Sequence, residues 1–123
     1  MESVGRSFNV LVVEDYPDVA DMMNAMIRML GHRASIAGTI AAAVENASKE
    51  NFDLFLVDHK LPDGIGSDIL KKIPQPERPQ AVLLTAFDET SLPPAVKEGF
   101  SLVLRKPVDL NVLRETIDSL CER

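Results

Sequence analysis

Apolar residues gather in four strong runs and one weaker run along the chain. The strong runs are at 8–13 (FNVLVV), 53–57 (DLFLV), 81–84 (AVLL) and 102–104 (LVL), and the weaker run is at 34–37 (ASIA). Polar residues do not alternate with the apolar ones inside these runs, so we expect strands that are covered on both faces. This continuity is typical of the strands of a parallel β-sheet.

Helical patterns separate the apolar runs. Between Val19 and Leu30 the apolar residues follow i, i+3, i+4 spacing, which predicts an amphipathic helix. Pro17 suits the first turn of this helix, and Gly31 is expected to end it. Four more helices are predicted: from a Thr39 cap to about Glu50, from Ser67, after Ser91 with Pro93 and Pro94 in the opening turn, and after an Asp109 cap.

Strand and helix therefore alternate five times, and this order predicts the fold class. It is typical of an α/β domain with a doubly wound parallel sheet and right-handed crossovers. A chain of 123 residues is long enough for one such domain with a single sheet. We expect residues 1–7 to form an N-terminal tail and residues 8–123 to form the domain.

Composition and charge exclude several function classes. A net charge of −6 opposes direct binding to the phosphate backbone of nucleic acids, which depends on clustered Lys and Arg. No apolar stretch approaches the ~20 residues that span a bilayer, so no membrane contact is expected. The first residues lack the apolar core of a secretion signal, which makes the cytoplasm the expected location.

Polar side chains follow four of the five predicted strands. Glu14 and Asp15 follow the first strand, Asp58 the third, Thr85 the fourth and Lys106 the fifth. The carboxyl ends of parallel strands meet at one edge of a sheet, where open α/β folds bind their ligands. Carboxylates about 4 Å apart repel by roughly 4 kcal/mol at an effective dielectric constant of ~20, so three acids there require a cation. All-oxygen ligands favour Mg²⁺, and the set as a whole is suited to holding a phosphoryl group that Asp58 attacks.

Four motifs, in this order, resemble the receiver domain of two-component response regulators over nearly the whole chain. They are "VLVVED" at 10–15, "LVDHKLPDGIG" at 56–66, "LLTA" at 83–86 and "LRKP" at 104–107. The resemblance implies a (βα)5 flavodoxin-like fold with strand order 2-1-3-4-5. It also implies a signalling phosphoacceptor with Mg²⁺ as cofactor, whose only chemistry is self-phosphorylation and autodephosphorylation, and which is not an enzyme in its own right.

The same resemblance assigns a role to each residue at the strand ends. Asp58 matches the phosphoacceptor, Thr85 the switch hydroxyl, and Lys106 the cation that pairs with the phosphoryl group. The implied metal ligands are Glu14 through water, Asp15, Asp58 and the backbone carbonyl of Lys60. The implied partners are a histidine kinase or histidine phosphotransfer domain as donor and a downstream effector, and phosphorylation-dependent homodimerisation is a further option. The Lys106–Pro107 bond is often cis in the family.

Three residues depart from the family pattern, in two places along the chain. Val103 lies where receivers commonly carry Tyr or Phe, so the usual coupling to the output face is in doubt. Pro93 and Pro94 raise the same doubt for the fourth helix.

Lys60 and Phe87 flank the path of the water that hydrolyses the acyl phosphate in this family. We expect bulky Phe87 to shield the acyl phosphate from this water.

Other readings of these residues stay open at this stage. Asp15 or Asp58 alone would more often be a solvated strand-end acid, and Glu14 could be a solvated neighbour of Asp15. His59 next to Asp58 is expected to be structural or exposed.

The chain could be an interaction module that works without phosphorylation. A third option is an Mg²⁺-dependent aspartyl phosphohydrolase, but Lys60 stands where such enzymes carry a second acid. A stand-alone regulator and a receiver of a hybrid kinase are equally compatible with the sequence.

Overall fold

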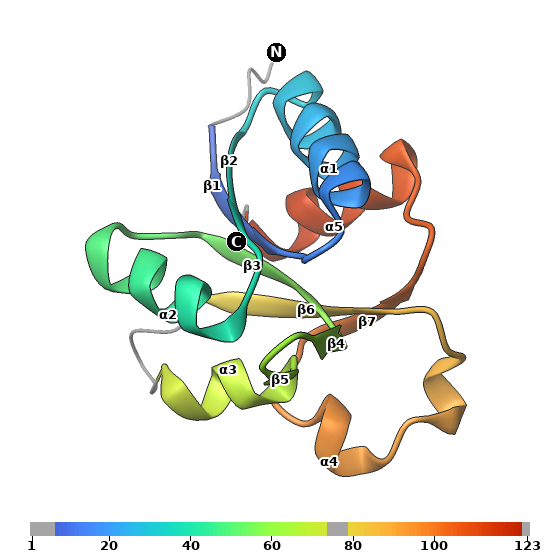
Figure 1. Ribbon diagram of the computed structural model, residues 1–123. Helices are drawn as coiled ribbons and strands as arrows, with labels where there is room; N and C mark the ends of the chain where they lie inside the picture. The colour runs from blue at the N-terminus through green and yellow to red at the C-terminus, as the bar shows by residue number, and fades with distance from the viewer. Residues whose placement is uncertain (1–6, 74–78, 122–123) are drawn as a thin grey trace.

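The computed structural model describes residues 7–73 and 79–121, so all but the last residue of the predicted tail 1–7 lies outside the described part. Its main sheet is parallel, with the order β2-β1-β3-β6-β7 (Figure 1). Counted along the chain within this sheet, the order is 2-1-3-4-5, which confirms the predicted fold class. The strands are β1 (Asn9–Val13), β2 (Arg33–Ala37), β3 (Leu54–Asp58), β6 (Gln80–Thr85) and β7 (Leu102–Arg105).

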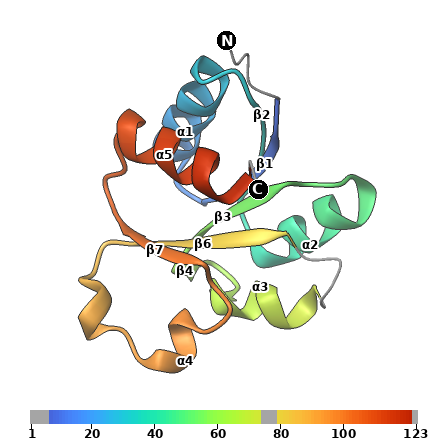
Figure 2. The same cartoon turned by 180° about the vertical axis from the view of Figure 1, so that it is seen from behind.

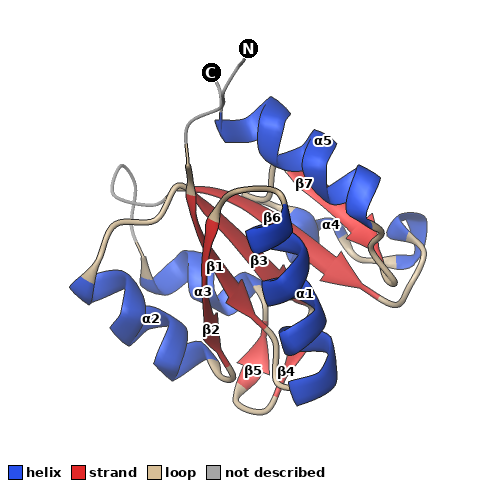
Figure 3. Cartoon of the chain, turned by 90° about the horizontal axis from the view of Figure 1, so that it is seen from above, coloured by secondary structure: helices blue, strands red, loops and turns tan. Residues whose placement is uncertain are grey.

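Helices cover both faces of the sheet. Figure 3 shows α1 and α5 on one face and α2 and α3 on the other, and Figure 2 shows the same arrangement from behind. The helices are α1 (Pro17–Met29), α2 (Ile40–Lys49), α3 (Ser67–Lys72), α4 (Pro94–Lys97) and α5 (Leu110–Cys121). Among the described residues, no helix combines the length and apolarity needed to cross a membrane.

Two hydrophobic cores hold the sheet in place, one on each face. Val10 and Val12 of β1 pack in the core that includes the inner sides of α1 and α5. Leu11 and Val13, the alternate residues of the same strand, pack in the core under α2 and α3. Because successive side chains of a strand point to opposite faces, an uninterrupted apolar run is what two cores require. The residues of β1 and β3 are all buried, as the sequence predicted.

The predicted helix ends are also found in the structure. The Thr39 side chain accepts a hydrogen bond from Ala42 N at 3.0 Å and so caps α2. Asp109 Oδ1 accepts one from Val112 N at 2.8 Å at the start of α5. Gly31 follows α1 with a φ of 91°, a backbone conformation that favours glycine, which explains why α1 ends there.

The structure adds three short elements that the sequence analysis did not predict. They are the antiparallel pair β4 (Lys60–Leu61) and β5 (Gly64–Ile65) and a 3-10 turn, η1 (Glu89–Ser91). At the tip of the β4–β5 hairpin, Asp63 accepts hydrogen bonds from the backbone N–H groups of Ile40 and Ala41 at 2.8 and 3.1 Å. This contact lowers the pKa of Asp63, because both N–H groups favour its carboxylate form. These two hydrogen bonds therefore hold the loop after Asp58 against the beginning of α2.

Gly66 packs tightly against the end of β3. A Cβ atom at Gly66 would lie 2.5 Å from the Asp58 carbonyl oxygen and 2.9 Å from Val57 Cγ1. We expect Gly66→Ala to displace the end of β3 and to lower the free energy of unfolding by about 1–3 kcal/mol, the usual range for overpacking. Urea denaturation measures this change.

Gly38 provides the matched control for that substitution. A Cβ atom at Gly38 would meet no atom within 4 Å. Gly38→Ala should therefore leave the free energy of unfolding within about 1 kcal/mol of wild type. Equal effects of the two substitutions would contradict the tight packing behind Asp58.

Candidate functional site

The residues predicted at the strand ends do meet at one edge of the sheet. Asp58 is the last residue of β3, Thr85 is the last residue of β6, and Lys106 directly follows β7. All three line a cleft of about 370 Å³, together with Tyr16, His59, Lys60, Ala86 and Phe87. Because β1 and β6 flank β3 in the sheet, the loops after these two strands form the two sides of the cleft around Asp58.

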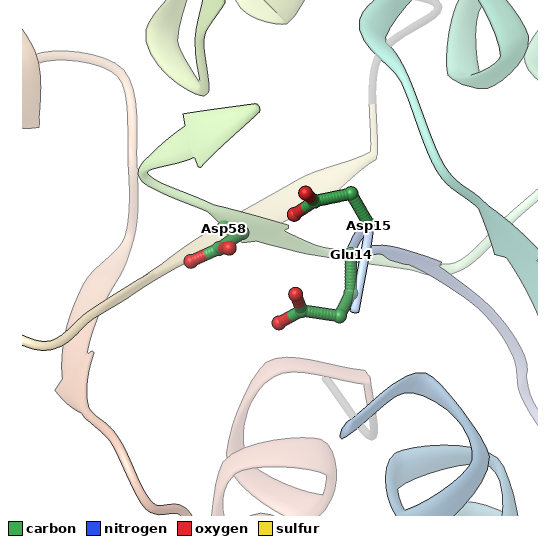
Figure 4. A group of neighbouring side chains, drawn as sticks. All are labelled: Glu14, Asp15 and Asp58. Carbon is green, nitrogen blue, oxygen red and sulfur yellow. The ribbon is translucent and has the colours of Figure 1, made fainter. Parts of the chain in front are cut away.

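Three carboxylates form a cluster beside this cleft. Each of Glu14, Asp15 and Asp58 offers an oxygen, and these oxygens lie within 4.8 Å of one another. Figure 4 shows Glu14 and Asp15 leaving the end of β1 with their carboxylates turned to the side on which the Asp58 carboxylate lies. Glu14 and Asp58 are only 3% and 8% exposed, whereas Asp15 is exposed. The reading of Glu14 as a solvated neighbour of Asp15 is therefore wrong.

This acid cluster fits a divalent cation. It consists of carboxylate oxygens only, which suits Mg²⁺ better than a metal that prefers nitrogen or sulfur. Two of its members are buried, so their mutual repulsion is poorly screened by water. Lys60, whose backbone carbonyl was predicted as a further ligand, lines the neighbouring cleft.

Lys106 lies between the two buried carboxylates. Its Nζ atom donates to Asp58 Oδ1 at 3.1 Å and to Glu14 Oε1 at 3.2 Å. Asp58 Oδ1 also accepts a hydrogen bond from His59 N at 3.0 Å. The side chain of Lys106 is 25% exposed, so the ion pairs are partly shielded from water. One ammonium group thus compensates two acids.

Lys106 only partly offsets the forces that disfavour an ionised Asp58, whereas the two acids strongly favour the charged form of Lys106. Burial raises the pKa of Asp58, the negative charge of Glu14 raises it further, and the contacts with Lys106 and His59 N only partly oppose this. Burial alone would lower the pKa of Lys106, but its hydrogen bonds and charge interactions with Asp58 and Glu14 outweigh burial and raise the pKa. Lys106 therefore stays charged, and an ionised Asp58 is held in an unfavourable environment.

The Thr85 side chain faces the loop that follows it. Thr85 is only 1% exposed, and its Oγ1 atom accepts a hydrogen bond from Phe87 N at 3.0 Å. Since the hydroxyl acts as an acceptor in this contact, its own proton remains available for donation. Thr85 can therefore donate to a group in the cleft without giving up this contact.

Aromatic side chains frame the cleft, and Tyr16 among them was not identified from the sequence. The Phe87 ring lies 5.3 Å from Lys60 Nζ and contacts the His59 ring edge-on with a centroid distance of 6.4 Å. Burial lowers the pKa of the half-buried His59, and the positive charge of Lys60 adds to this. A signal for Tyr16 was present, because it directly follows Asp15 at the end of an apolar run.

The two departures from the family pattern are visible in the structure. Val103 pairs with Leu83 across β6 and β7 and is half-buried. The helix α4 has only four residues, with Pro93 as its N-cap and Pro94 as its first residue. The Lys106–Pro107 bond is cis, as the resemblance implied.

Comparisons with known proteins agree with this geometry. The family model for the response regulator receiver domain matches residues 10–118. This chain belongs to the receiver domain family. The predicted resemblance is thereby confirmed: the chain is a receiver domain of two-component systems, a signalling module of a family that binds Mg²⁺ at its acidic site. Receiver domains of this kind interact with histidine kinases and effector domains.

Relatives of this receiver domain include regulators and a sensor protein. It is 34% identical to the response regulator protein PilR of Pseudomonas aeruginosa, with 87% of this chain and 24% of PilR covered. It is 32% identical to the aerobic respiration control sensor protein ArcB of Escherichia coli, with 90% of this chain and 15% of ArcB covered. This chain thus spans only a small part of either relative.

Solved receiver structures have the same fold. A receiver domain from Methylobacillus flagellatus matches with a TM-score of 0.85 and 26% identity, over 94% of this chain and 99% of that one. The receiver domain of a sensor histidine kinase from Pseudomonas aeruginosa matches with a TM-score of 0.84 and 25% identity, over 96% of this chain and all of that one. That domain has a magnesium ion coordinated in its active-site cleft.

The raised pKa of Asp58 predicts a change of stability with pH. A carboxyl group whose pKa is higher in the folded protein stabilises the fold below its unfolded pKa, near 4, and loses this contribution as the pH rises through the folded pKa. We therefore expect Asp58→Asn, which stays neutral, to raise the free energy of unfolding at pH 7 by about 0.5–2 kcal/mol. The gain should disappear near pH 4. Urea denaturation in the presence of EDTA measures both values.

Asp15→Asn is the control for this substitution. Asp15 belongs to the same acid cluster but is exposed, so water screens its charge. Its replacement should change the stability less than Asp58→Asn at pH 7. A destabilised Asp58→Asn variant at pH 7 would show that Lys106 stabilises the ionised carboxylate more than burial and Glu14 oppose it.

Proposed function

We propose that this receiver domain accepts a phosphoryl group from a phosphohistidine on Asp58 and that the phosphorylated form changes its contacts with partner proteins. The observation that carries the proposal is the position of Lys106 Nζ, which lies within 3.2 Å of oxygens of both Asp58 and Glu14. A positive charge at that point can pair with a phosphoryl oxygen as soon as one arrives.

Asp58 is the nucleophile in this proposal. Among the described residues, its Oδ1 atom accepts the hydrogen bonds from His59 N and Lys106 Nζ, so Oδ2 is left to attack phosphorus. As the Oδ2–P bond forms, the P–N bond of the phosphohistidine breaks, and its electron pair stays on the imidazole nitrogen. Lys106 stabilises the negative charge on the transferring group, and the Thr85 hydroxyl donates to one of its oxygens.

Three carboxylates and one carbonyl would hold the cofactor. Glu14, Asp15 and Asp58, with the backbone carbonyl of Lys60, are the candidate Mg²⁺ ligands, Glu14 through water. When bound, Mg²⁺ supplies positive charge that offsets the repulsion between the acids and the incoming phosphoryl group. The buried position of Glu14 is consistent with a role in keeping Lys106 and the cluster in place.

The partners follow from this chemistry. The donor is a histidine kinase or a histidine phosphotransfer domain in the cytoplasm, and the reader of the signal is an effector protein or domain. Homodimerisation on phosphorylation is one way in which the phosphorylated domain can pass on the signal. With Val103 in β7 and a single-turn α4, the signal is read differently from receivers that move an aromatic side chain.

The two other functions receive less support. An interaction module that works without phosphorylation does not require Lys106 to bridge two buried acids, a contact that the structure contains. A phosphohydrolase of the aspartyl type would need an acid two residues after Asp58, where this chain has Lys60. Val103 is the feature that best supports the first alternative.

Labelling with a small acyl phosphate tests the proposal. Incubation with acetyl phosphate and Mg²⁺ should produce one acid-stable, base-labile adduct on the wild-type protein, detected by intact mass. Asp58→Asn should abolish the adduct, because an amide cannot form an acyl phosphate. Removal of Mg²⁺ with EDTA should strongly slow its formation, because the acids then repel the donor.

The outcomes separate the three candidate functions. Labelling that survives Asp58→Asn would move the acceptor to another residue. A wild-type protein that no donor labels would favour the phosphorylation-independent module. Rapid multiple turnover of acetyl phosphate would favour a phosphohydrolase.

Phe87 is expected to control the lifetime of the adduct. Its side chain lines the cleft next to Asp58 and is held by contacts with Lys60 and His59. Phe87→Ala removes this cover and should speed autodephosphorylation severalfold, because water then reaches the acyl phosphate more easily. The measurement is the decay of the adduct after the donor is removed. An unchanged decay rate would rule out the shielding role.

A further inference from the structure

The capping of α2 is completed by a residue from a distant part of the chain. The backbone N–H groups at the start of a helix have no acceptor within it, and in α2 the first three such groups find other partners. Thr39 Oγ1 accepts from Ala42 N at 3.0 Å. The Asp63 carboxylate accepts from Ile40 N at 2.8 Å and from Ala41 N at 3.1 Å, although it lies 23 and 22 positions further along the chain.

Asp63 lies in the turn of a hairpin that is too short to hold its own position. β4 and β5 have two residues each, and an isolated two-stranded hairpin is at best marginally stable in water. Contacts outside the hairpin must therefore fix it. At its base, Gly66 N donates to His59 O at 2.8 Å, and Leu61 packs against the core under α2 and α3. At its tip, the carboxylate of Asp63 makes the two hydrogen bonds with α2.

Lys60, the first residue of this hairpin, lies between the contact at the base and the contact at the tip. Its backbone carbonyl is one of the candidate Mg²⁺ ligands, and Asp63 follows it by three residues. A backbone carbonyl has no side-chain torsion with which to adjust to an ion, so its place depends on the path of the chain. Residues that orient a metal ligand without touching the metal commonly control metal affinity.

The contact of Asp63 with α2 is strong enough for such a role. Each of its two carboxylate oxygens accepts one N–H group of the helix. These hydrogen bonds are charge-assisted, and they lie at the positive end of the helix dipole. Asp63 can therefore hold the hairpin although its side chain is exposed.

We propose that Asp63 is a positioning residue for the metal ion: by holding the tip of the β4–β5 hairpin against α2, it fixes the place of the Lys60 carbonyl. This inference rests on the proposed function and adds a connection between the metal site and α2. Such a coupling acts in both directions. Mg²⁺ bound at the acid cluster should therefore stabilise the contacts of Asp63 with Ile40 N and Ala41 N.

Magnesium titrations test this role. Binding is measured by calorimetry and by the fluorescence of Tyr16, which follows Asp15 and is the only tyrosine in a chain without tryptophan. Asp63→Ala should raise the dissociation constant for Mg²⁺ about tenfold, the lower end of the range for residues that orient metal ligands. The rate of labelling by acetyl phosphate should return to the wild-type value at saturating Mg²⁺, because the variant loses affinity for the ion but no reacting group.

Thr39→Ala and Asp63→Asn are the matched controls. Thr39→Ala removes a cap from the same end of α2 but leaves the hairpin in place, so the dissociation constant should stay close to the wild-type value. Asp63→Asn loses the same charge as Asp63→Ala but keeps one acceptor oxygen for α2. It should therefore weaken Mg²⁺ binding less than Asp63→Ala does.

Amide hydrogen exchange measures the coupling from the side of α2. In the wild-type protein, Mg²⁺ should slow the exchange of the Ile40 and Ala41 amides, because it stabilises their contact with Asp63. In Asp63→Ala the same amides should exchange rapidly with or without Mg²⁺. Thr39→Ala should retain the effect of Mg²⁺ on both amides.

Three results would overturn the role of Asp63 while leaving the proposed function intact. An unchanged dissociation constant in Asp63→Ala would show that the hairpin holds its place without this contact. An equal increase in Asp63→Asn would assign the effect to charge, and an equal increase in Thr39→Ala would assign it to the capping of α2. A wild-type protein that binds no Mg²⁺ would also overturn this role, and if acetyl phosphate failed to label it as well, the proposed function would fall with it.

Discussion

The contact of Lys106 with two buried carboxylates is the interaction on which the site depends. Glu14 and Asp58 are separated by 44 positions along the chain and Lys106 by 48 more, yet one ammonium group donates to both. Two ionised acids within 4.8 Å would repel by several kcal/mol at the effective dielectric of a protein interior. The lysine lowers this repulsion enough for the cluster to exist, but not enough to remove the penalty on ionised Asp58.

This residual penalty connects stability with function. A carboxylate that is poorly compensated in the folded protein gains from any added positive charge. The site therefore keeps an unfavourable electrostatic environment that a bound cation can relieve. The two cores on either face of the sheet supply the rigidity that this arrangement needs.

Aromatic residues line the cleft beside its acidic centre. Tyr16 and Phe87 border the centre, and each is attached through its backbone N–H to a residue of the centre. In the same half of the chain as Phe87, Val103 lies in β7 at the position where the resemblance implies Tyr or Phe, and α4 has only four residues.

Most of the fold could be predicted from the sequence, because it depends on local patterns. Continuous apolar runs, helical spacing, the Thr39 and Asp109 caps and the stop at Gly31 each act within a few residues. The β4–β5 hairpin and η1 were not predicted, because two- and three-residue elements have no periodicity and are held by distant contacts such as that of Asp63 with α2.

The identity of most residues in the candidate site could likewise be predicted from the sequence, but their burial and the directions of their side chains could not. The sequence alone identified Glu14, Asp15, Asp58, Thr85 and Lys106, since parallel strands end at one edge and side chains there must meet. It could not determine that Glu14 is buried while its neighbour Asp15 is exposed, or that Tyr16 reaches the cleft. Burial and the direction of a side chain depend on what the rest of the chain places around it, so only the tertiary structure decided them.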